Sequence, residues 1–237
     1  MREIKKKIYS TIALVAARSG SKGIKKKNFL KFKNEYIVSN AVKIGESIKS
    51  IHKVILSSDS FKILGLVGEN KKIFKIKRSK SLSRDNTPML PVMKDAILKY
   101  EKNFKSKVKK LVILDPTSIL RKKIYITQAL KNFNKKKADL LISVCKSQHD
   151  PYFSILEKKG NYYSLSKKSN KMIGGRQQSK SVYNINTVVW IYSREAIMNQ
   201  KKRIPKKTII YTIPEEISLE LNTKDDLNKV KKFISHA

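Results

Sequence analysis

The feature that most restricts the fold of this chain is an alternation between short apolar runs and stretches with apolar residues at every third or fourth position. Residues 8–16 form a nearly continuous apolar run, which is typical of a strand buried on both faces of a parallel sheet. Residues 52–58 form a second such run, and between the two Ile37, Ala41 and Ile44 recur at helical spacing. Further strands are predicted at 73–76, 108–114, 138–145, 187–192 and 208–213, and further helices at 63–67, 93–100, 126–133 and from 223. This alternation predicts an α/β domain with a doubly wound, mostly parallel sheet.

The alternation is interrupted between residues 147 and 184. This segment is polar and rich in Tyr and Lys, it contains Gly160 and the pair Gly174–Gly175, and it shows no helical period. We interpret it as an insertion of short strands and loops. The regular pattern then resumes, and the last helix begins with a capping box formed by Thr223 and Asp226, three residues apart.

The charge of the chain is strongly positive. It has 54 Lys and Arg against 18 Asp and Glu, which gives a formal net charge of +36. Of these cations 46 are Lys and 8 are Arg, whereas proteins that read bases rely on the planar fork of Arg. The Lys residues are also spread along nearly every segment, often in runs such as 25–27 and 135–137. We therefore interpret most of the charge as a solvated surface, and nucleic-acid binding is the less favoured reading, although such a field attracts any phosphate.

Composition also excludes several classes of protein. With 40% hydrophobic residues the chain can bury a core, so it is not a disordered basic tail. No apolar run reaches the roughly eighteen residues of a membrane span, and we interpret residues 8–17 as a strand rather than a signal peptide. A single cysteine, Cys145, rules out an internal disulfide and fits a cytoplasmic location. The three His are scattered, so no zinc site is predicted.

The densest group of chemically useful residues follows the first predicted strand. Residues 17–28 read ARSGSKGIKKKN, and they lie at the edge where open α/β sheets bind their ligands. Gly20 and Gly23 allow close backbone approach, and exposed N–H groups with Lys22 and Lys27 would suit a phosphate. The spacing matches neither a Walker A loop nor the Gly-x-Gly-x-x-Gly loop of dinucleotide sites. On spacing alone the segment is either a phosphate site or a basic surface turn.

The same loop resembles the N-terminal signature of the acylneuraminate cytidylyltransferases, the family of the CMP–sialic acid synthetases and their nonulosonic-acid relatives. The matched residues are Ala17, Arg18, Ser21, Lys22, Gly23, Lys27 and Asn28. Further blocks that resemble the family follow in order: Ser57–Asp59, Arg78–Asp85, Asp115–Arg121, Arg176–Gln178 and Asn186–Trp190. Because the blocks keep the family's order over nearly the whole chain, their combination is far more specific than any one block.

The resemblance implies a fold, a reaction and a partner. Residues 1–237 would form a single nucleotidyltransferase domain like the nucleotide-diphospho-sugar transferases, with 147–184 as its dimerisation and sugar-binding extension. The enzyme would join CTP to a sialic-acid-like (nonulosonic) keto sugar acid and release pyrophosphate. The anomeric hydroxyl would attack the α-phosphate directly, so catalysis would consist mostly of positioning and charge neutralisation. The resemblance also implies a homodimer.

The resemblance further assigns roles to individual residues. Lys27 and Arg18 would be catalytic, with Lys27 stabilising charge at the α-phosphate. The implied nucleotide-binding residues are Ala17, Arg18, Ser21, Lys22, Lys27, Asn28, Arg78, Ser83 and Asp85. The implied sugar-binding residues are Asp115, Arg176, Gln177 and Asn186. A bidentate pair between Arg176 and the sugar carboxylate would suit an α-keto acid.

The chain departs from the family pattern where the family binds its divalent metal. The family carries an Asp-Ile-Asp-Thr block, in which this chain has Glu220 and Asn222 in place of the two Asp. We expect Mg²⁺ to be bound by these two residues, but more weakly, because one negative charge is lost. Asp115 stands where the family usually has Gln, and Thr187 replaces the Gly of an Asn-Gly-Ala block. The change at Thr187 would narrow the pocket. Sialic acid synthetases can carry a Lys near the position of Phe153, and the loss of this cation together with the gain of the Asp115 anion favours an acceptor other than ordinary N-acetylneuraminate.

These departures leave two alternatives open. The chain could be a nucleotidyltransferase of the same superfamily that acts on a different sugar or on a sugar 1-phosphate. It could instead be a catalytically decayed protein that binds a nucleotide or another polyanion. Several residues of the blocks also admit plainer roles: Asp59 and Thr117 as helix caps, and Arg121 as the partner of a surface acid.

Overall fold

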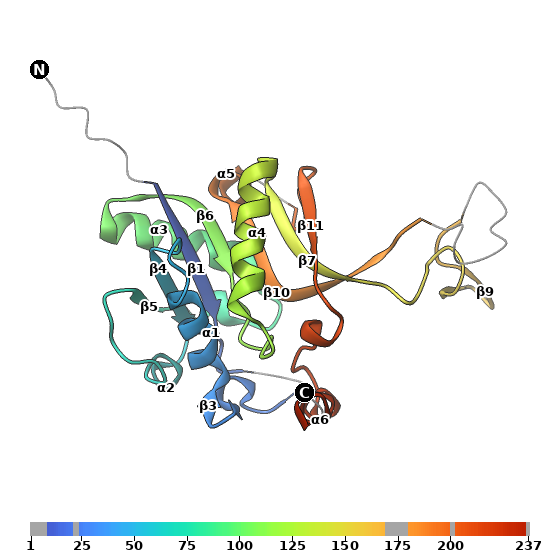
Figure 1. The fold of residues 1–237 in the computed structure, drawn as a ribbon, viewed down its shortest axis with the longest axis horizontal. Coiled ribbons are helices and arrows are strands. Elements are labelled where there is room, and N and C mark those ends of the chain that lie inside the picture. The colour runs from blue at the N-terminus through green and yellow to red at the C-terminus, as the bar shows by residue number, and fades with distance from the viewer. Residues whose placement is uncertain (1–8, 21–23, 169–179, 200–201, 236–237) are drawn as a thin grey trace, which may run out of the picture.

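The fold is built around a seven-stranded sheet in the order β11-β7-β10-β6-β1-β4-β5 (Figure 1). It is taken from a computed structural model that describes residues 9–20, 24–168, 180–199 and 202–235. The strands are β1 (Tyr9–Ala16), β4 (Lys53–Ser58), β5 (Ile73–Lys77), β6 (Lys107–Ile113), β7 (Leu140–Lys146), β10 (Tyr183–Ser193) and β11 (Thr208–Thr212). Neighbouring strands are parallel except where β10 runs antiparallel to β6 and β7. The mostly parallel sheet expected from the sequence is confirmed.

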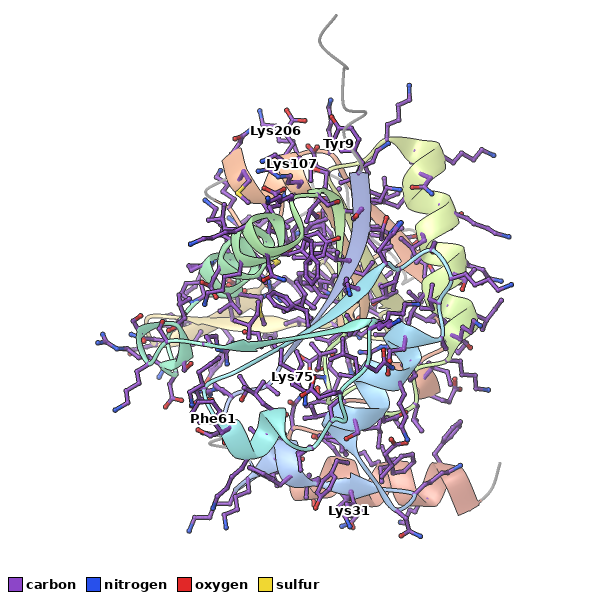
Figure 2. The ribbon with its side chains drawn as sticks, turned by 90° about the vertical axis from the view of Figure 1, so that its left-hand side faces the viewer. Tyr9, Lys31, Phe61, Lys75, Lys107 and Lys206 are labelled. Atoms are coloured by element: carbon purple, nitrogen blue, oxygen red, sulfur yellow. The ribbon has the colours of Figure 1, made fainter. Side chains whose placement is uncertain are left out.

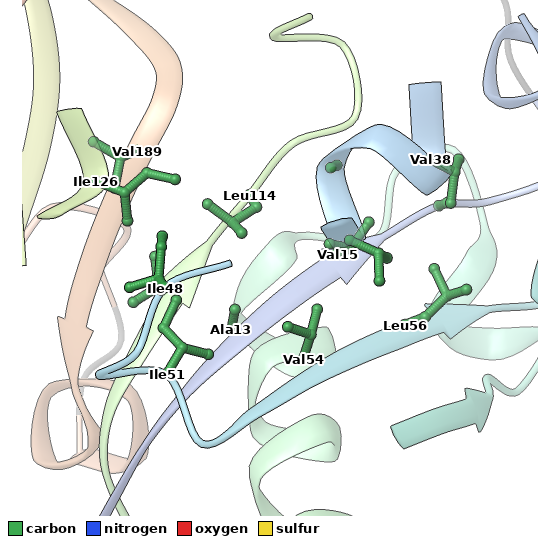
Figure 3. Packing of buried hydrophobic residues seen from close by; sticks show 14 of the residues in the cluster. Ala13, Val15, Val38, Ile48, Ile51, Val54, Leu56, Leu114, Ile126 and Val189 are labelled. Atoms are coloured by element: carbon green, nitrogen blue, oxygen red, sulfur yellow. The ribbon is translucent and has the colours of Figure 1, made fainter. Parts of the chain in front are cut away.

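Helices cover both faces of the sheet because its strands are apolar on both sides. Successive side chains of a strand point to opposite faces. In β1, Ile12 and Leu14 pack in one core with α3 and α5, whereas Ala13 and Val15 pack in the other with α1 and α4 (Figure 3). The helices are α1 (Ile37–Glu46), α2 (Phe61–Leu64), α3 (Met89–Phe104), α4 (Lys123–Lys136), α5 (Arg194–Asn199) and α6 (Lys224–Ser235). The doubly wound α/β class is therefore confirmed.

Short elements account for most differences from the sequence expectation. The strands β2 (Lys31–Phe32) and β3 (Glu35–Tyr36) form a hairpin that the apolar pattern does not predict. Its turn places Lys33 and Asn34 at φ of 49° and 63°, and Lys is not a residue that signals such a turn. The six-residue α5 was likewise not predicted, and β10 begins at Tyr183, four residues before its predicted start.

The described residues between β7 and β10 include a hairpin that stands away from the central sheet (Figure 1). Its strands are β8 (Leu156–Lys159) and β9 (Tyr162–Leu165), which pair antiparallel across a turn containing Gly160 at φ 61°. Short strands are thus present where the sequence predicts an insertion. Its use as a dimerisation and sugar-binding extension stays a prediction.

The positive charge is distributed over the described surface. Lys31, Lys107 and Lys206 are exposed, and Lys31 and Lys206 lie at opposite ends of the view in Figure 2. This distribution agrees with a solvated surface rather than one localised polyanion site. Among the described residues, no helix is long and apolar enough to cross a membrane. Cys145 is a buried free thiol on β7.

The start of α6 has the capping box that the sequence predicts. The Thr223 N–H donates to the Asp226 carboxylate at 2.7 Å, and the Asp226 N–H donates to the Thr223 hydroxyl at 3.2 Å. The Asn222 N–H donates to the same carboxylate at 2.9 Å. Burial alone would raise the pKa of Asp226, but these hydrogen bonds outweigh it and lower the pKa. The cap therefore fixes the backbone at residue 222 independently of that residue's side chain.

A buried carboxylate connects α3, α5 and the amino-terminal end of β6, at the end of the strands away from this cap. Glu101 of α3 accepts two hydrogen bonds from the Arg194 guanidinium of α5, at 2.7 and 3.0 Å. It also accepts one from the Lys107 ammonium at 3.1 Å and one from the Val108 N–H at 3.0 Å, both on β6. Burial raises the pKa of Glu101, but these donors outweigh burial and hold it at about 2.

Glu101 should stabilise the fold above pH 4.5 and lose this effect as the pH falls. Its pKa is lower in the folded chain than its ordinary value of 4.5, so the contribution is complete above 4.5 and disappears towards pH 2. We expect Glu101→Gln to lower the free energy of unfolding at pH 7 by on the order of 2 kcal/mol. Urea denaturation from pH 7 to 2.5 should show the two proteins converging. The exposed Glu195→Gln on α5 is the control, and a gap for Glu101→Gln that does not change with pH would contradict the assignment.

Candidate active site

A pocket of about 470 Å³ opens where β1 and β6 end, with Ala16 and Asp115 in its wall. From β1 the chain passes to β4 and β5 on one side, and it returns to β6 on the other side of β1. The order of the strands therefore reverses at β1, and open α/β sheets bind their ligands at such a point. A hollow of similar volume, about 480 Å³, lies beside the β2–β3 hairpin and includes none of the residues predicted from the sequence.

Most of the predicted site residues with described positions line this one pocket. Those in its wall are Arg18, Lys27, Asn28, Arg78, Asp85, Asp115, Glu220 and Asn222. Ala17 and Asn186 are buried beside it, and Ser83 is joined to Arg78 by a hydrogen bond of 3.1 Å. Ser21, Lys22, Arg176 and Gln177 lie outside the described residues. The structure thus brings together residues as far apart in the sequence as Arg18 and Asn222.

The loop after β1 is held by side chains on both of its sides. The Ser19 N–H and hydroxyl both donate to the Asp59 carboxylate, at 2.8 and 2.6 Å. Burial would raise the pKa of Asp59, but the hydrogen bonds from Ser19 outweigh it and lower the pKa. The Asn28 amide donates to the Arg18 carbonyl at 2.8 Å. Asp59 is thus an anchor for the loop, and the cap of α2 is Ser60 instead.

Arg18 and Asp85 form an ion pair across the pocket. Beside them Arg78 is buried, and burial lowers the pKa of its guanidinium, although Arg stays charged at neutral pH. The Arg78 Nε donates to the Ser83 hydroxyl, which in turn donates to the Ser79 carbonyl at 2.9 Å. A bound anion would therefore have to compete with Asp85 for Arg18.

The segment after β6 is held from beneath by a buried guanidinium. Arg121 is only 4% exposed and donates to the carbonyls of Asp115, Thr187 and Val188. Burial lowers the pKa of Arg121 to about 10, so the group remains charged at neutral pH. It is not the partner of a surface acid. The Asp115 carboxylate accepts from the Thr117 N–H at 2.9 Å and hydroxyl at 2.7 Å, so Thr117 braces this turn rather than capping α4.

A second, largely apolar hollow of about 550 Å³ adjoins the first and shares Met89 and Asp115 with it. Trp190 and Thr187 of β10 form part of its wall. Behind the wall lies Asn186, which is 4% exposed. Its side-chain oxygen accepts a hydrogen bond from the Ser143 hydroxyl at 2.6 Å. Its side-chain nitrogen has no hydrogen-bond partner among the described residues. An unused buried donor of this kind is costly unless a ligand or water meets it.

The two residues predicted to bind metal lie side by side in the pocket. One Glu220 oxygen accepts from the Thr187 N–H at 2.7 Å, and the other accepts from the Asn222 amide at 3.4 Å. The Asn222 oxygen accepts from the Lys27 ammonium at 3.1 Å. Within the described ranges, no three His, Cys, Asp or Glu side chains cluster as a metal site would require. The pair fits Mg²⁺ only where nucleotide phosphates and water complete the coordination.

Sequence reasoning missed several residues of the pocket. Arg84, within the Arg78–Asp85 block, also lines it, as do Thr87, Met89 and Val92, which follow that block within seven residues. Their position next to that block is the signal that could have found them. Nothing in the sequence indicates the hydrogen bond between Lys27 and Asn222, because 195 residues separate the two.

Comparison with known proteins agrees with this geometry. The chain is 27% identical over 224 residues to the CMP-N,N′-diacetyllegionaminic acid synthase of Campylobacter jejuni, with 94% of each protein covered. It is 27% identical over 222 residues to an N-acylneuraminate cytidylyltransferase of Streptococcus agalactiae, with 91% of this chain but 51% of that protein covered. The solved structure of a CMP:2-keto-3-deoxy-manno-octonic acid synthetase complexed with CTP is similar in fold, with a TM-score of 0.64 at 11% identity over 96% of this chain and 99% of that one.

The family itself is settled by a match that covers most of the chain. The model of the cytidylyltransferase family matches residues 12–222, which include every described residue of the pocket wall. The resemblance found in the sequence blocks is thereby confirmed. The chain belongs to the cytidylyltransferase family.

Proposed function

We propose that this cytidylyltransferase joins CTP to a sialic-acid-like (nonulosonic) keto sugar acid and releases pyrophosphate. The observation that carries the proposal is the pocket at the end of β1, where Arg18 and Lys27 of the first sequence block meet Asp115 of a separate block. The names of the relatives from Campylobacter jejuni and Streptococcus agalactiae support an acceptor of this class.

The reaction needs no covalent intermediate with the protein. The anomeric oxygen attacks the α-phosphorus and forms a new P–O bond, the bond to the bridging oxygen breaks, and pyrophosphate leaves as the hydroxyl proton is released. Negative charge builds up on the phosphate oxygens in the transition state. Lys27 stabilises this charge. Arg18 leaves its ion pair with Asp85 and binds a phosphate oxygen instead. Ser21 and Lys22 are assigned to the phosphates by the sequence resemblance alone.

The acceptor lies between the charged pocket and the apolar hollow, because Asp115 belongs to both. The Asp115 carboxylate can accept hydrogen bonds from sugar hydroxyls, whereas the side-chain nitrogen of Asn186 is buried behind the wall, so the sugar-binding role of Asn186 rests on the resemblance alone. The apolar wall that includes Trp190 suits an acyl or methyl substituent on the sugar. Arg176 and Gln177 remain assigned to the sugar by resemblance alone, with Arg176 assigned to its carboxylate.

The proposed reaction includes a divalent metal, whose role is limited to neutralising part of the triphosphate charge. Glu220 and Asn222 would hold Mg²⁺ together with the nucleotide phosphates. The metal would neutralise part of the triphosphate charge. The remaining neutralisation comes from the cations of the pocket itself.

The hairpin of β8 and β9 supports a homodimer. Its pairing register places Leu156, Tyr163 and Leu165 on one face together with Lys158, and the three apolar side chains are exposed by 61%, 65% and 38%. An apolar face of this kind on a projecting hairpin is typical of an interaction surface. A second copy of the chain would cover it by presenting the same face, as in a two-fold dimer.

A pyrophosphate-release screen tests the proposed reaction. The four nucleoside triphosphates are combined with a panel of nonulosonic acids, 3-deoxy keto sugar acids and sugar 1-phosphates. We expect turnover that requires CTP, Mg²⁺ and a nonulosonic acid together, because these fill the charged pocket and the apolar hollow. Turnover with a sugar 1-phosphate instead would favour the other branch of the superfamily. CTP binding without turnover under any combination would mean that the site has decayed.

The catalytic assignment is tested by Lys27→Ala. We expect kcat to fall at least about a hundredfold, because the cation assigned to the reacting phosphate is lost. Lys25→Ala removes an exposed Lys of the same loop and should leave kcat within about twofold. Circular dichroism and the melting temperature should be the same for all three proteins. A kcat near that of the wild type in Lys27→Ala would remove this residue from the catalytic step.

The dimer is tested on the two faces of the hairpin. Analytical ultracentrifugation should give twice the monomer mass of 27.3 kDa for the wild type. Tyr163→Asp places a charge on the apolar face and should yield monomer. Tyr162→Asp makes the same change on the opposite face, which is also exposed, and should remain dimeric. A monomeric wild type, or equal effects of the two changes, would contradict this interface.

A further inference from the structure

We propose that Asn222 is a positioning residue that holds Lys27 in the nucleotide pocket without neutralising its charge. As a consequence, the protein should bind CTP with unusually little dependence on Mg²⁺. This inference rests on the proposed function, since it concerns how the same pocket receives a triphosphate.

The Asn222 amide joins two groups of opposite charge. Its oxygen accepts a hydrogen bond from the Lys27 ammonium at 3.1 Å, and its nitrogen donates to the Glu220 carboxylate at 3.4 Å. Glu220 is itself oriented by the Thr187 N–H, at 2.7 Å. Lys27 is therefore connected through a neutral group to an anchored carboxylate and has a fixed place in the wall of the pocket.

The two contacts require a neutral group that accepts one hydrogen bond and donates another, and the Asn222 amide does both. A carboxylate at position 222 would have no hydrogen to donate and would repel Glu220. It would also form a direct ion pair with Lys27 and offset the charge that faces the ligand. Among the residues that the structure describes, no carboxylate is paired with the Lys27 ammonium. Its charge therefore remains available to a phosphate.

The balance of charge in the pocket makes Lys27 important. The described wall contains four cations and three acids, namely Arg18, Lys27, Arg78 and Arg84 against Asp85, Asp115 and Glu220. Arg18 is already paired with Asp85. An Asp at 222 would make the numbers equal and leave the wall without excess positive charge. The neutral amide thus preserves the difference that attracts a triphosphate.

The position of residue 222 does not depend on its own side chain. Its N–H donates to Asp226, and the Leu221 N–H donates to the Thr117 carbonyl at 3.1 Å. A change at 222 should therefore alter the charge at the pocket and leave the backbone in place. This separation makes the inference testable by substitution.

The test measures CTP binding to the full chain by isothermal titration calorimetry, once in EDTA and once with Mg²⁺. We expect the wild type to bind in both buffers, with Kd values within about tenfold of each other. Asn222→Asp should bind at least about tenfold more weakly in EDTA and recover much of the loss with Mg²⁺, which raises the ratio of the two Kd values. Asn222→Ala should weaken binding in EDTA because Lys27 loses its anchor, and at least as much with Mg²⁺ because a metal ligand is lost as well, so the ratio should not rise as it does in Asn222→Asp. Asn228→Asp adds the same charge at an exposed position of α6 outside the pocket wall and should match the wild type.

A purely structural role for Asn222 would lower the melting temperature without changing the ratio of the two Kd values. An unchanged ratio in Asn222→Asp, or an equal change in Asn228→Asp, would therefore overturn the inference. If the wild type still releases pyrophosphate from CTP and a nonulosonic acid, that result leaves the proposed function intact. Absence of CTP binding by the wild type in both buffers would overturn the proposed function and this inference together.

Discussion

The rest of the structure depends on the burial of β1 on both faces between parallel neighbours. Its residues 12–15 have no exposed surface, and β4 and β6 pair with its two edges. Parallel neighbours require crossover connections, and here these connections cover opposite faces of the sheet. The loops after β1 and β6 consequently leave the same edge next to each other. The pocket containing Arg18 and Asp115 is a direct result of this arrangement.

The sequence predicts those parts of the fold in which burial is decided locally. The apolar period of β1 and the capping box of Thr223 and Asp226 are each contained within a dozen residues, and both are found as expected. The sequence does not predict the β2–β3 hairpin, because its strands have two residues each and Lys33 takes a positive φ. Contacts between distant side chains are not predicted for a different reason. No period in the sequence relates Ser19 to Asp59 or Lys27 to Asn222.

Polar groups at the site mainly hold one another in place. Arg121 is buried and gives its hydrogen bonds to carbonyls of two separate segments, so the turn at Asp115 and the strand β10 form one wall. A buried cation that lacks hydrogen-bond partners strongly destabilises a fold. Here three carbonyl oxygens accept hydrogen bonds from Arg121 and offset the cost of burying its charge. The sequence block containing Asp115 and Arg121 therefore combines a ligand-facing residue with the residue that fixes it.

The charge of the whole chain and the charge of the pocket act over different distances. A net charge of +36 concentrates anions near the surface, but salt screens such a field beyond about 8 Å at physiological ionic strength. Among the described residues of the pocket wall, cations exceed acids by only one, and Arg18 and Arg78 are already engaged. The pocket must therefore distinguish a triphosphate from other polyanions through those cations that are not already paired with an acid. A single neutral side chain beside Lys27 can then decide more about the ligand than the dozens of surface Lys.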